Sequence, residues 1–258
     1  MDPLAVSLLC DPDTHSPLIL GDGFLLNPES GKRYPIRNGI PSFSNQIDGS
    51  NRKYQKMYDR LAVGYDFAES LYKRFSSAPD YRREYIAELE IPDGGRVLEV
   101  SVGTGANLRY LRCETDFFGL DLSWGMLRRC HQKFKNGHHR LQLFHGEAER
   151  LPFRSGVFDC VFHVGGINFF NDRAAAIREM IRVAHPGTKI VIVDETEKAV
   201  TGIYQKNPLT RSYFKGTEKA AVCPVDLLPP GMQEVRTRQV LNGKLYCLTF
   251  RTPLSPRV

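Results

Sequence analysis

The sequence predicts an α/β protein with a Rossmann-like, mostly parallel seven-stranded sheet covered by helices on both faces. Apolar runs typical of buried strands alternate with amphipathic stretches between about residues 93 and 195. One such run, residues 96–100, continues through Gly103 and Gly105 into a helical pattern, as α/β folds do at a nucleotide-binding loop. Ligands of these folds bind outside the carboxyl ends of the strands, so we expect the site there.

Composition fits a globular protein with one large core and a small appendage. The chain has 258 residues, of which 41% are hydrophobic. Because no apolar run approaches the ~20 residues that cross a bilayer, and the N-terminus lacks the pattern of a signal peptide, we expect a cytoplasmic protein without a membrane span. Six single cysteines fit reduced thiols. The net charge of +6 is dispersed, so it permits an RNA partner without requiring one, and the oligomeric state stays open.

Residues 1–48 are predicted to form a separate small β-rich segment. Short apolar runs at 18–20, 24–26 and 33–36 are separated by turns rich in glycine, aspartate and serine. Such a meander is too small to have much of a core of its own.

Residues 49–92 are predicted to be a helical lead-in to the main domain, residues 93–258. In residues 51–75 apolar side chains recur at spacings of three and four, and Gly64 is the expected break between two shorter helices. A further helix is expected over 81–89.

The main domain is predicted to alternate and then to end in a hairpin. Residues 196–232 interrupt the alternation and are interpreted as a substrate-covering insertion. Strands 235–241 and 245–251 flank Asn242 and Gly243, the dipeptide that hairpin turns favour. The preceding elements are expected to be strand 96–101, helix 106–111, strand 116–121, helix 124–134, strands 141–145 and 157–163, helix 173–184 and strand 189–194.

Two acidic residues at strand ends indicate the ligand. Asp121 ends a strand about twenty residues past the glycines, where such folds bind a ribose diol. Ser101 and Leu108 do not fit the glycine pattern of a dinucleotide site, and Glu99 would repel a pyrophosphate. Glu99 instead suits the ammonium group of a nucleoside that carries an amino-acid tail.

Four motifs in this order resemble those of class I S-adenosylmethionine (SAM) methyltransferases. Residues 97–105, Val-Leu-Glu-Val-Ser-Val-Gly-Thr-Gly, resemble the cofactor loop of that family, and residues 119–123 resemble its next acidic strand end. Residues 146–153, Gly-Glu-Ala-Glu-Arg-Leu-Pro-Phe, resemble the segment at the adenine, and 158–162 the fourth strand. The nearest branch contains the ubiquinone and menaquinone biosynthesis methyltransferases.

The resemblance implies SAM as cofactor, S-adenosylhomocysteine as product, and a set of binding residues. Ser101 stands at the first glycine of the family pattern and Glu147 at its usual aspartate, and we expect binding to survive both changes. His163 begins the loop that borders SAM and the acceptor, so it is the candidate proton acceptor, although a lone histidine at a strand end is more often structural. The implied cofactor-binding residues are Glu99, Ser101, Gly103, Thr104, Gly105, Asp121, Leu122, Glu147, Ala148 and His163.

Aromatic residues outside these motifs are the candidate lining for the methyl acceptor. Residues 58–66 resemble a Tyr-Asp-x-x-Ala-x-x-Tyr-Asp stretch that lies over the cofactor in the quinone branch, although such a stripe more often only packs. The predicted function is methyl transfer by in-line displacement to a small aromatic or apolar metabolite. The predicted acceptor-binding residues are Tyr58, Tyr65, Asn168, Tyr204, Tyr213 and Phe214.

The N-terminal segment resembles a small zinc-ribbon-like domain that precedes some methyltransferases. The closing motif of residues 34–43 is present, but only Cys10 remains of the ligands, with His15 as a second candidate, so we expect a degenerate ribbon without metal that packs on the main domain. Asp13, Asn27 and Ser30 stand roughly where the other ligands would be. A ribbon also occurs in rRNA guanine methyltransferases, which makes RNA base methylation the alternative. A SAM-binding protein without methyl-transfer activity is the third.

Overall fold

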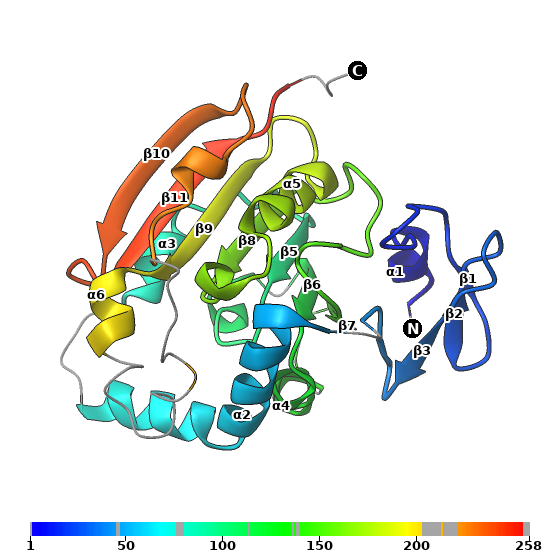
Figure 1. The fold of residues 1–258 in the computed structure, drawn as a ribbon, viewed down its shortest axis with the longest axis horizontal. Helices are drawn as coiled ribbons and strands as arrows, with labels where there is room; N and C mark the ends of the chain where they lie inside the picture. Colours follow the sequence, from blue (N-terminus) through cyan, green and yellow to red (C-terminus); the bar gives the residue numbers. More distant parts are fainter. Residues whose placement is uncertain are drawn as a thin grey trace.

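The computed structural model describes residues 2–44, 47–75, 80–112, 114–135, 137, 140–202, 213 and 221–254, and the side chains of 63–75 lie outside that description. Within these residues the chain forms a seven-stranded sheet and a smaller four-stranded one (Figure 1). No helix among them combines the length and apolarity needed to cross a bilayer.

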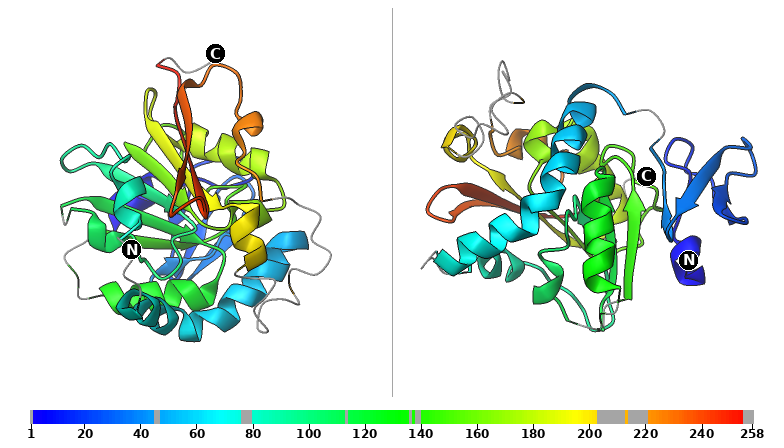
Figure 2. Two further views of the ribbon diagram at one scale, coloured as in Figure 1. Left: turned by 90° about the vertical axis from the view of Figure 1, so that its left-hand side faces the viewer. Right: turned by 90° about the horizontal axis from the view of Figure 1, so that it is seen from below.

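The large sheet confirms the predicted fold class. Its five parallel strands have the order β9-β8-β5-β6-β7, and β11 and β10 add an antiparallel hairpin beside β9. Figure 2 shows the sheet from two further directions. The strands are β5 (Arg96–Val100), β6 (Asp116–Asp121), β7 (Arg140–His145), β8 (Cys160–Val164), β9 (Lys189–Glu195), β10 (Gln233–Val240) and β11 (Leu245–Arg251).

Helices bury both faces of this sheet. Helix α5 (Arg173–Val183) packs on one face, and α3 (Arg82–Ile86) and α4 (Trp124–Phe134) pack on the other. Successive strand residues therefore enter different cores, as Val97 and Leu98 of β5 do. Continuous apolar strands were the sequence signal for this two-faced burial.

Helix α2 (Gly49–Phe75) lies beside α4 and is one continuous helix (Figures 1 and 2). The expected break at Gly64 is therefore wrong, because a glycine inside a helix costs only about 1 kcal/mol and does not end it. Asp59 joins the two helices, since its Oδ1 accepts hydrogen bonds from the Ser123 hydroxyl at 2.6 Å and the Gly125 N–H at 2.8 Å. The amide of Gly125 belongs to the first turn of α4, where a carboxylate is stabilising.

Two other predicted helices are shorter than expected. The helix expected over 106–111 is a single 3₁₀ turn, η1 (Leu108–Tyr110). Its N-cap residue Asn107 uses its side chain to contact Glu99 and Tyr85, and Leu111 is already extended. The helix expected over 81–89 is α3, a single short turn of helix.

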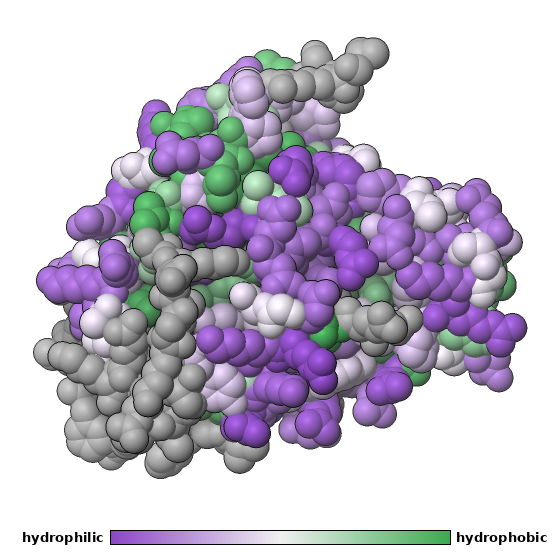
Figure 3. All heavy atoms as spheres, viewed as in Figure 1, coloured by the Kyte–Doolittle hydropathy of each residue, from purple (hydrophilic) through white to green (hydrophobic). Residues whose placement is uncertain are grey.

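The smaller sheet belongs to the N-terminal module, which we define as residues 2–44. It contains α1 (Pro3–Ser7) and the antiparallel strands β1 (Ile19–Leu20), β2 (Phe24–Leu26), β3 (Arg33–Arg37) and β4 (Ile40–Pro41). The surface over this module, at the right of Figure 3, is mainly hydrophilic. Most buried hydrophobic side chains of the module, among them Leu9, Leu25 and Tyr34, join the core on the α5 face of the large sheet, and Ile40 joins the core on the other face. The module therefore shares a core with the main domain.

Hydrogen bonds occupy the positions where the resemblance placed metal ligands. Asp11 Oδ2 accepts from Asn27 Nδ2 at 2.7 Å and from the Tyr34 hydroxyl at 2.8 Å. Asp13 forms ion pairs with Lys32 and Arg150. This network holds the module's strands and turns together.

The expected insertion at 196–232 contains two short described elements, α6 (Glu197–Val200) and η4 (Val225–Leu227). Tyr204 and Phe214 lie outside the described residues, as does the side chain of Tyr65.

Candidate active site

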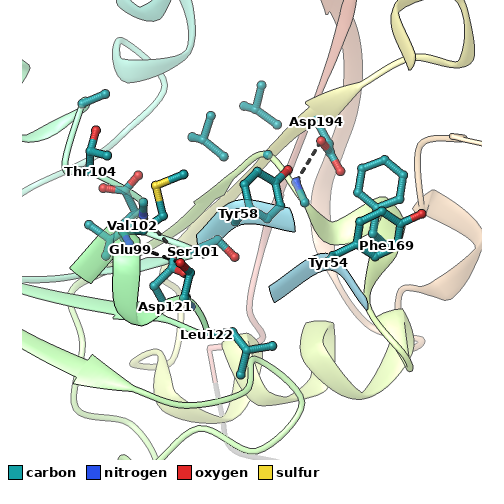
Figure 4. Close-up of a pocket in the computed structure, with 18 of the residues that line it drawn as sticks. Tyr54, Tyr58, Glu99, Ser101, Val102, Thr104, Asp121, Leu122, Phe169 and Asp194 are labelled. Carbon is teal, nitrogen blue, oxygen red and sulfur yellow. Dashed lines mark hydrogen bonds between the residues drawn. The ribbon is translucent and has the colours of Figure 1, made fainter. Parts of the chain in front are cut away.

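A pocket opens at the carboxyl ends of β5, β6, β8 and β9, beneath α2. This is the edge where the glycine loop predicted a ligand. Figure 4 shows polar residues of the β5 and β6 ends on one side and aromatic residues on the other. Its lining includes Tyr54, Tyr58, Arg82, Glu99, Ser101, Gly103, Thr104, Asn107, Asp121, Leu122, Gly165, Gly166, Phe169, Phe170, Asp194 and Glu195.

Glu99 is a buried acid at the wall of this pocket. Its side chain is only 1% exposed, and its Oε1 accepts a hydrogen bond from Asn107 Nδ2 at 2.6 Å. Within the described residues, Oε2 is buried and has no hydrogen-bond partner. Burial raises the pKa of Glu99 to about 8, and the nearby Arg82 opposes that shift. A buried oxygen without a partner is costly, so this wall is built to receive a donor, and a cation most of all.

Asp121 ties together the loops that follow β5 and β6. Its Oδ2 accepts from the Gly103 N–H at 2.8 Å, and its Oδ1 accepts from the Ser123 N–H at 2.8 Å. Burial raises the pKa of Asp121 to about 6. Each carboxylate oxygen can accept a second hydrogen bond, so Asp121 presents acceptors suited to a pair of hydroxyl groups.

Arg82, from α3, lines the pocket and was not among the predicted site residues. It is 6% exposed, lines the pocket, and its Nη1 donates to the Tyr81 hydroxyl at 2.6 Å. An arginine is rarely this buried without a purpose or a partner. A buried base near the buried acid Glu99 suits the carboxylate and ammonium groups of an amino acid.

Four other predicted cofactor residues line the pocket, and Gly105 does not. Ser101 takes a left-handed backbone with φ of +65°, which explains the family's glycine at this point. A Cβ at Gly105 would lie 2.7 Å from Cys130 Sγ, so this glycine lets α4 pack against the loop. The residues that line the pocket as predicted are Ser101, Gly103, Thr104 and Leu122.

The opposite wall is aromatic. Tyr54 stacks on Phe169 with ring centroids 4.5 Å apart, and Tyr58 faces the space between this pair and the acidic wall (Figure 4). Tyr58 was predicted here, whereas Tyr54 and Phe169 were not. The spacing of Tyr54 and Tyr58, one helical turn apart on α2, is the signal that identifies both as one face.

Asp194 shapes the loop between the two walls. Its Oδ1 accepts from the Gly166 N–H at 3.0 Å and its Oδ2 from the Asn168 N–H at 2.8 Å. Gly166 has φ of +110°, a conformation that only glycine adopts readily. Burial and the adjacent Glu195 raise the pKa of Asp194.

The structure places His163, the predicted proton acceptor and SAM contact, in the core beside the pocket. His163 is 0% exposed and does not reach the pocket. Its Nδ1–H donates to the Val100 carbonyl at 2.9 Å, and its Nε2 accepts from the Ile167 N–H at 3.1 Å. Burial lowers the pKa of His163 to about 4, so the ring is neutral and both nitrogens are engaged. His163 therefore lies within β8 and holds the Ile167 amide of the loop that follows this strand.

Four more predicted site residues lie outside the pocket lining. Glu147 contacts the Ser44 hydroxyl and Arg150, and Ala148 is buried in the core. Asn168 accepts from Tyr246 and donates to the Glu195 carbonyl. Tyr213 accepts from Arg60 and packs against the outside of the aromatic wall. Their side chains support the site without facing it.

The donor set fits SAM on the observations above. Glu99 offers a buried oxygen without a described partner, Arg82 offers a buried cation, and Asp121 offers acceptors at the next strand end. No group of three or more histidine, cysteine or acidic side chains placed to hold a metal occurs among the described residues.

Comparisons with known proteins point the same way. Residues 98–192 match the family described as a methyltransferase domain. The demethylmenaquinone methyltransferase of Listeria welshimeri is 29% identical over 168 residues, 63% of this chain and 70% of that protein. The ubiquinone/menaquinone biosynthesis C-methyltransferase UbiE of Geotalea daltonii is 29% identical over 155 residues, 58% and 66% of the two chains. A SAM-dependent methyltransferase from Aquifex aeolicus shares the fold, with a TM-score of 0.52, 18% identity, and coverage of 80% of this chain and 99% of that one.

Proposed function

We propose, since this chain belongs to the class I SAM-dependent methyltransferases, that it methylates a small aromatic acceptor of the quinol type. The observation that carries this choice is the pocket's division into an ionic wall and an aromatic wall. The relatives named for demethylmenaquinone support the same acceptor class.

The ionic wall holds the cofactor in this proposal. Glu99 accepts from the ammonium group of the methionine tail, Arg82 pairs with its carboxylate, and Asp121 accepts from the ribose hydroxyls. SAM supplies an electrophilic methyl group on a positively charged sulfur. The protein's contribution is to fix both ends of the cofactor, so that the methyl group has one position.

The aromatic wall holds the acceptor. The Tyr54–Phe169 stack and Tyr58 present ring faces that suit a flat aromatic ring. Helix α2 covers this wall and keeps water from the charged sulfur, and Asp59 fixes the helix to α4. This lining favours a small aromatic acceptor over an RNA base, which would need a basic track for the phosphates.

The direct test is to incubate the protein with SAM and a short-chain demethylmenaquinol. We expect S-adenosylhomocysteine and the ring-methylated product in equal amounts. The control acceptor is the same quinol with a methyl group already on the ring carbon that would be methylated. It should yield neither S-adenosylhomocysteine nor a methylated product. If the protein binds SAM normally but forms no product from the unmethylated quinol, the proposed acceptor class is wrong.

The cofactor assignment has its own test at Arg82. Decarboxylated SAM lacks the carboxylate that Arg82 is proposed to bind. The wild-type protein should bind SAM about tenfold more tightly than the decarboxylated form, and Arg82→Met should bind the two alike. Equal discrimination by both proteins would remove Arg82 from the cofactor site.

A further inference from the structure

The N-terminal module forms backbone hydrogen bonds with both ends of residues 145–154 of the main domain. At one end the Cys10 N–H donates to the Pro152 carbonyl at 3.1 Å, and the Arg154 N–H donates to the Leu8 carbonyl at 2.9 Å. At the other end the Phe43 N–H donates to the carbonyl of His145, the last residue of β7, at 2.8 Å. The module is therefore anchored to the main chain where β7 ends.

His145 connects this anchor to the pocket. The Ser42 hydroxyl donates to His145 Nδ1 at 2.8 Å, and His145 Nε2–H donates to the Leu122 carbonyl at 3.1 Å. The ring is buried and stacks on Trp124 with centroids 4.5 Å apart. Both ring nitrogens of His145 are therefore engaged in hydrogen bonds, one to the module and one to the loop after β6.

The far end of the chain of contacts is a wall of the cofactor site. Leu122 lines the pocket next to Asp121, and the Gly146 N–H donates to the Asp121 carbonyl at 3.1 Å. His145 and Gly146 thus fix the backbone of Asp121, the last residue of β6, and of Leu122, which follows it. A shift of this backbone would move the Asp121 carboxylate.

Two hydrogen bonds fix the tautomer and the orientation of His145, because the Leu122 carbonyl can only accept and the Ser42 hydroxyl can donate to the other nitrogen. Burial lowers the pKa of His145 to about 4, so the ring is neutral at physiological pH and carries one N–H. With the hydroxyl donating to Nδ1, the proton lies on Nε2 and points at the Leu122 carbonyl. Without that hydroxyl Nδ1 would be a buried acceptor without a donor, so the ring would lose one of the two hydrogen bonds that hold it against the Leu122 carbonyl.

We propose that Ser42 and His145 are positioning residues for SAM, through which the N-terminal module sets the geometry of Asp121 and Leu122. This inference rests on the proposed cofactor site. It gives the module a role in the enzyme beyond packing, without any metal.

The test compares two substitutions of equal shape. Ser42→Val and Ser42→Thr fill the same volume, but only the threonine keeps a hydroxyl. We expect Ser42→Val to raise the Kd for SAM, measured by calorimetry, about fivefold, as for the loss of one buried hydrogen bond. We expect Ser42→Thr to restore the Kd to within about twofold of wild type, and kcat at saturating SAM to stay unchanged in both.

Tyr34→Phe is the matched control. It also removes one buried hydroxyl of the module, the donor to Asp11, but that bond involves neither Ser42 nor His145. It should lower the melting temperature as Ser42→Val does and leave the Kd for SAM unchanged. His145→Phe keeps the ring on Trp124 while removing both hydrogen bonds, and should weaken SAM binding even if neither Ser42 variant folds.

Hydrogen exchange gives an independent readout. Amides of residues 120–124 should exchange faster in Ser42→Val than in Tyr34→Phe. Equal SAM affinity in wild type, Ser42→Val and His145→Phe would overturn the inference while leaving the proposed function intact. A wild-type protein that binds no SAM would instead overturn the proposed function.

Discussion

Raising the pH from 6.0 to 7.5 should strengthen SAM binding, because Glu99 must lose a proton before it pairs with an ammonium group. Burial raises the pKa of Glu99 to about 8. The free energy of deprotonating it at the working pH is about 2.7 kcal/mol at pH 6.0 and about 0.8 kcal/mol at pH 7.5. The difference, about 1.9 kcal/mol, corresponds to a fall of about twentyfold in Kd.

Isothermal titration in two buffers of different ionisation enthalpy measures both the affinity and the protons released. At pH 7.0 about 0.9 proton should leave for each SAM bound, since Glu99 is mostly protonated there. Glu99→Gln should bind SAM more weakly and release almost no proton. The pH dependence that this variant keeps comes from Asp121, because burial raises the pKa of Asp121 to about 6. Protonation of Asp121 should raise the Kd for SAM about twofold at pH 6.0.

Without ligand, the free energy of unfolding changes with pH in the opposite direction to the affinity for SAM. The native state holds a proton on Glu99 that the unfolded chain gives up near pH 4.5, so Glu99 makes the free energy of unfolding fall as pH rises from about 5 to 8. A Kd that stays flat between pH 6.0 and 7.5, with no proton released, would refute the role given to Glu99.

Four further substitutions separate structural from functional roles. Ser101→Gly should raise the free energy of unfolding, measured by urea denaturation, by about 1 kcal/mol, because glycine adopts the left-handed backbone without strain. An unchanged free energy of unfolding would mean that Ser101 is not strained. Asp59→Ala should lower it by about 1–2 kcal/mol through the lost contacts to α4, whereas a neutral effect would mean that α2 is held otherwise. His163→Gln should lower the melting temperature but keep the pH profile of kcat, and loss of the acidic limb would restore His163 as the base. Tyr58→Ala should raise the acceptor's KM about tenfold while the Kd for SAM stays constant, and the reverse pattern would move Tyr58 to the cofactor.

The strand ends of the site were predictable because local sequence encodes them. Apolar runs fix β5 and β6, and the parallel sheet then places their carboxyl ends at one edge, with Glu99 and Asp121 on it. Resemblance to the family added the ligand. The position of a residue inside the glycine loop does not fix its contacts: Gly105 lies outside the pocket lining, and its lack of a side chain makes room for Cys130 of α4.

Contacts between distant segments were not predictable in the same way. Arg82 reaches the pocket because α3 packs under the end of β5, and no local pattern distinguishes it from Arg83, which is exposed. His163 is oriented by the turn that returns the Ile167 amide to its ring. The chain of contacts from Ser42 to Leu122 spans three segments, so only the folded structure reveals it.

The most direct test of the account is a crystal structure of the protein with S-adenosylhomocysteine. We expect the ammonium group of the ligand about 3 Å from Glu99 Oε2, and its ribose hydroxyls in hydrogen bonds to the Asp121 carboxylate. A nucleoside bound elsewhere, or a tail that turns away from Glu99 and Arg82, would contradict it.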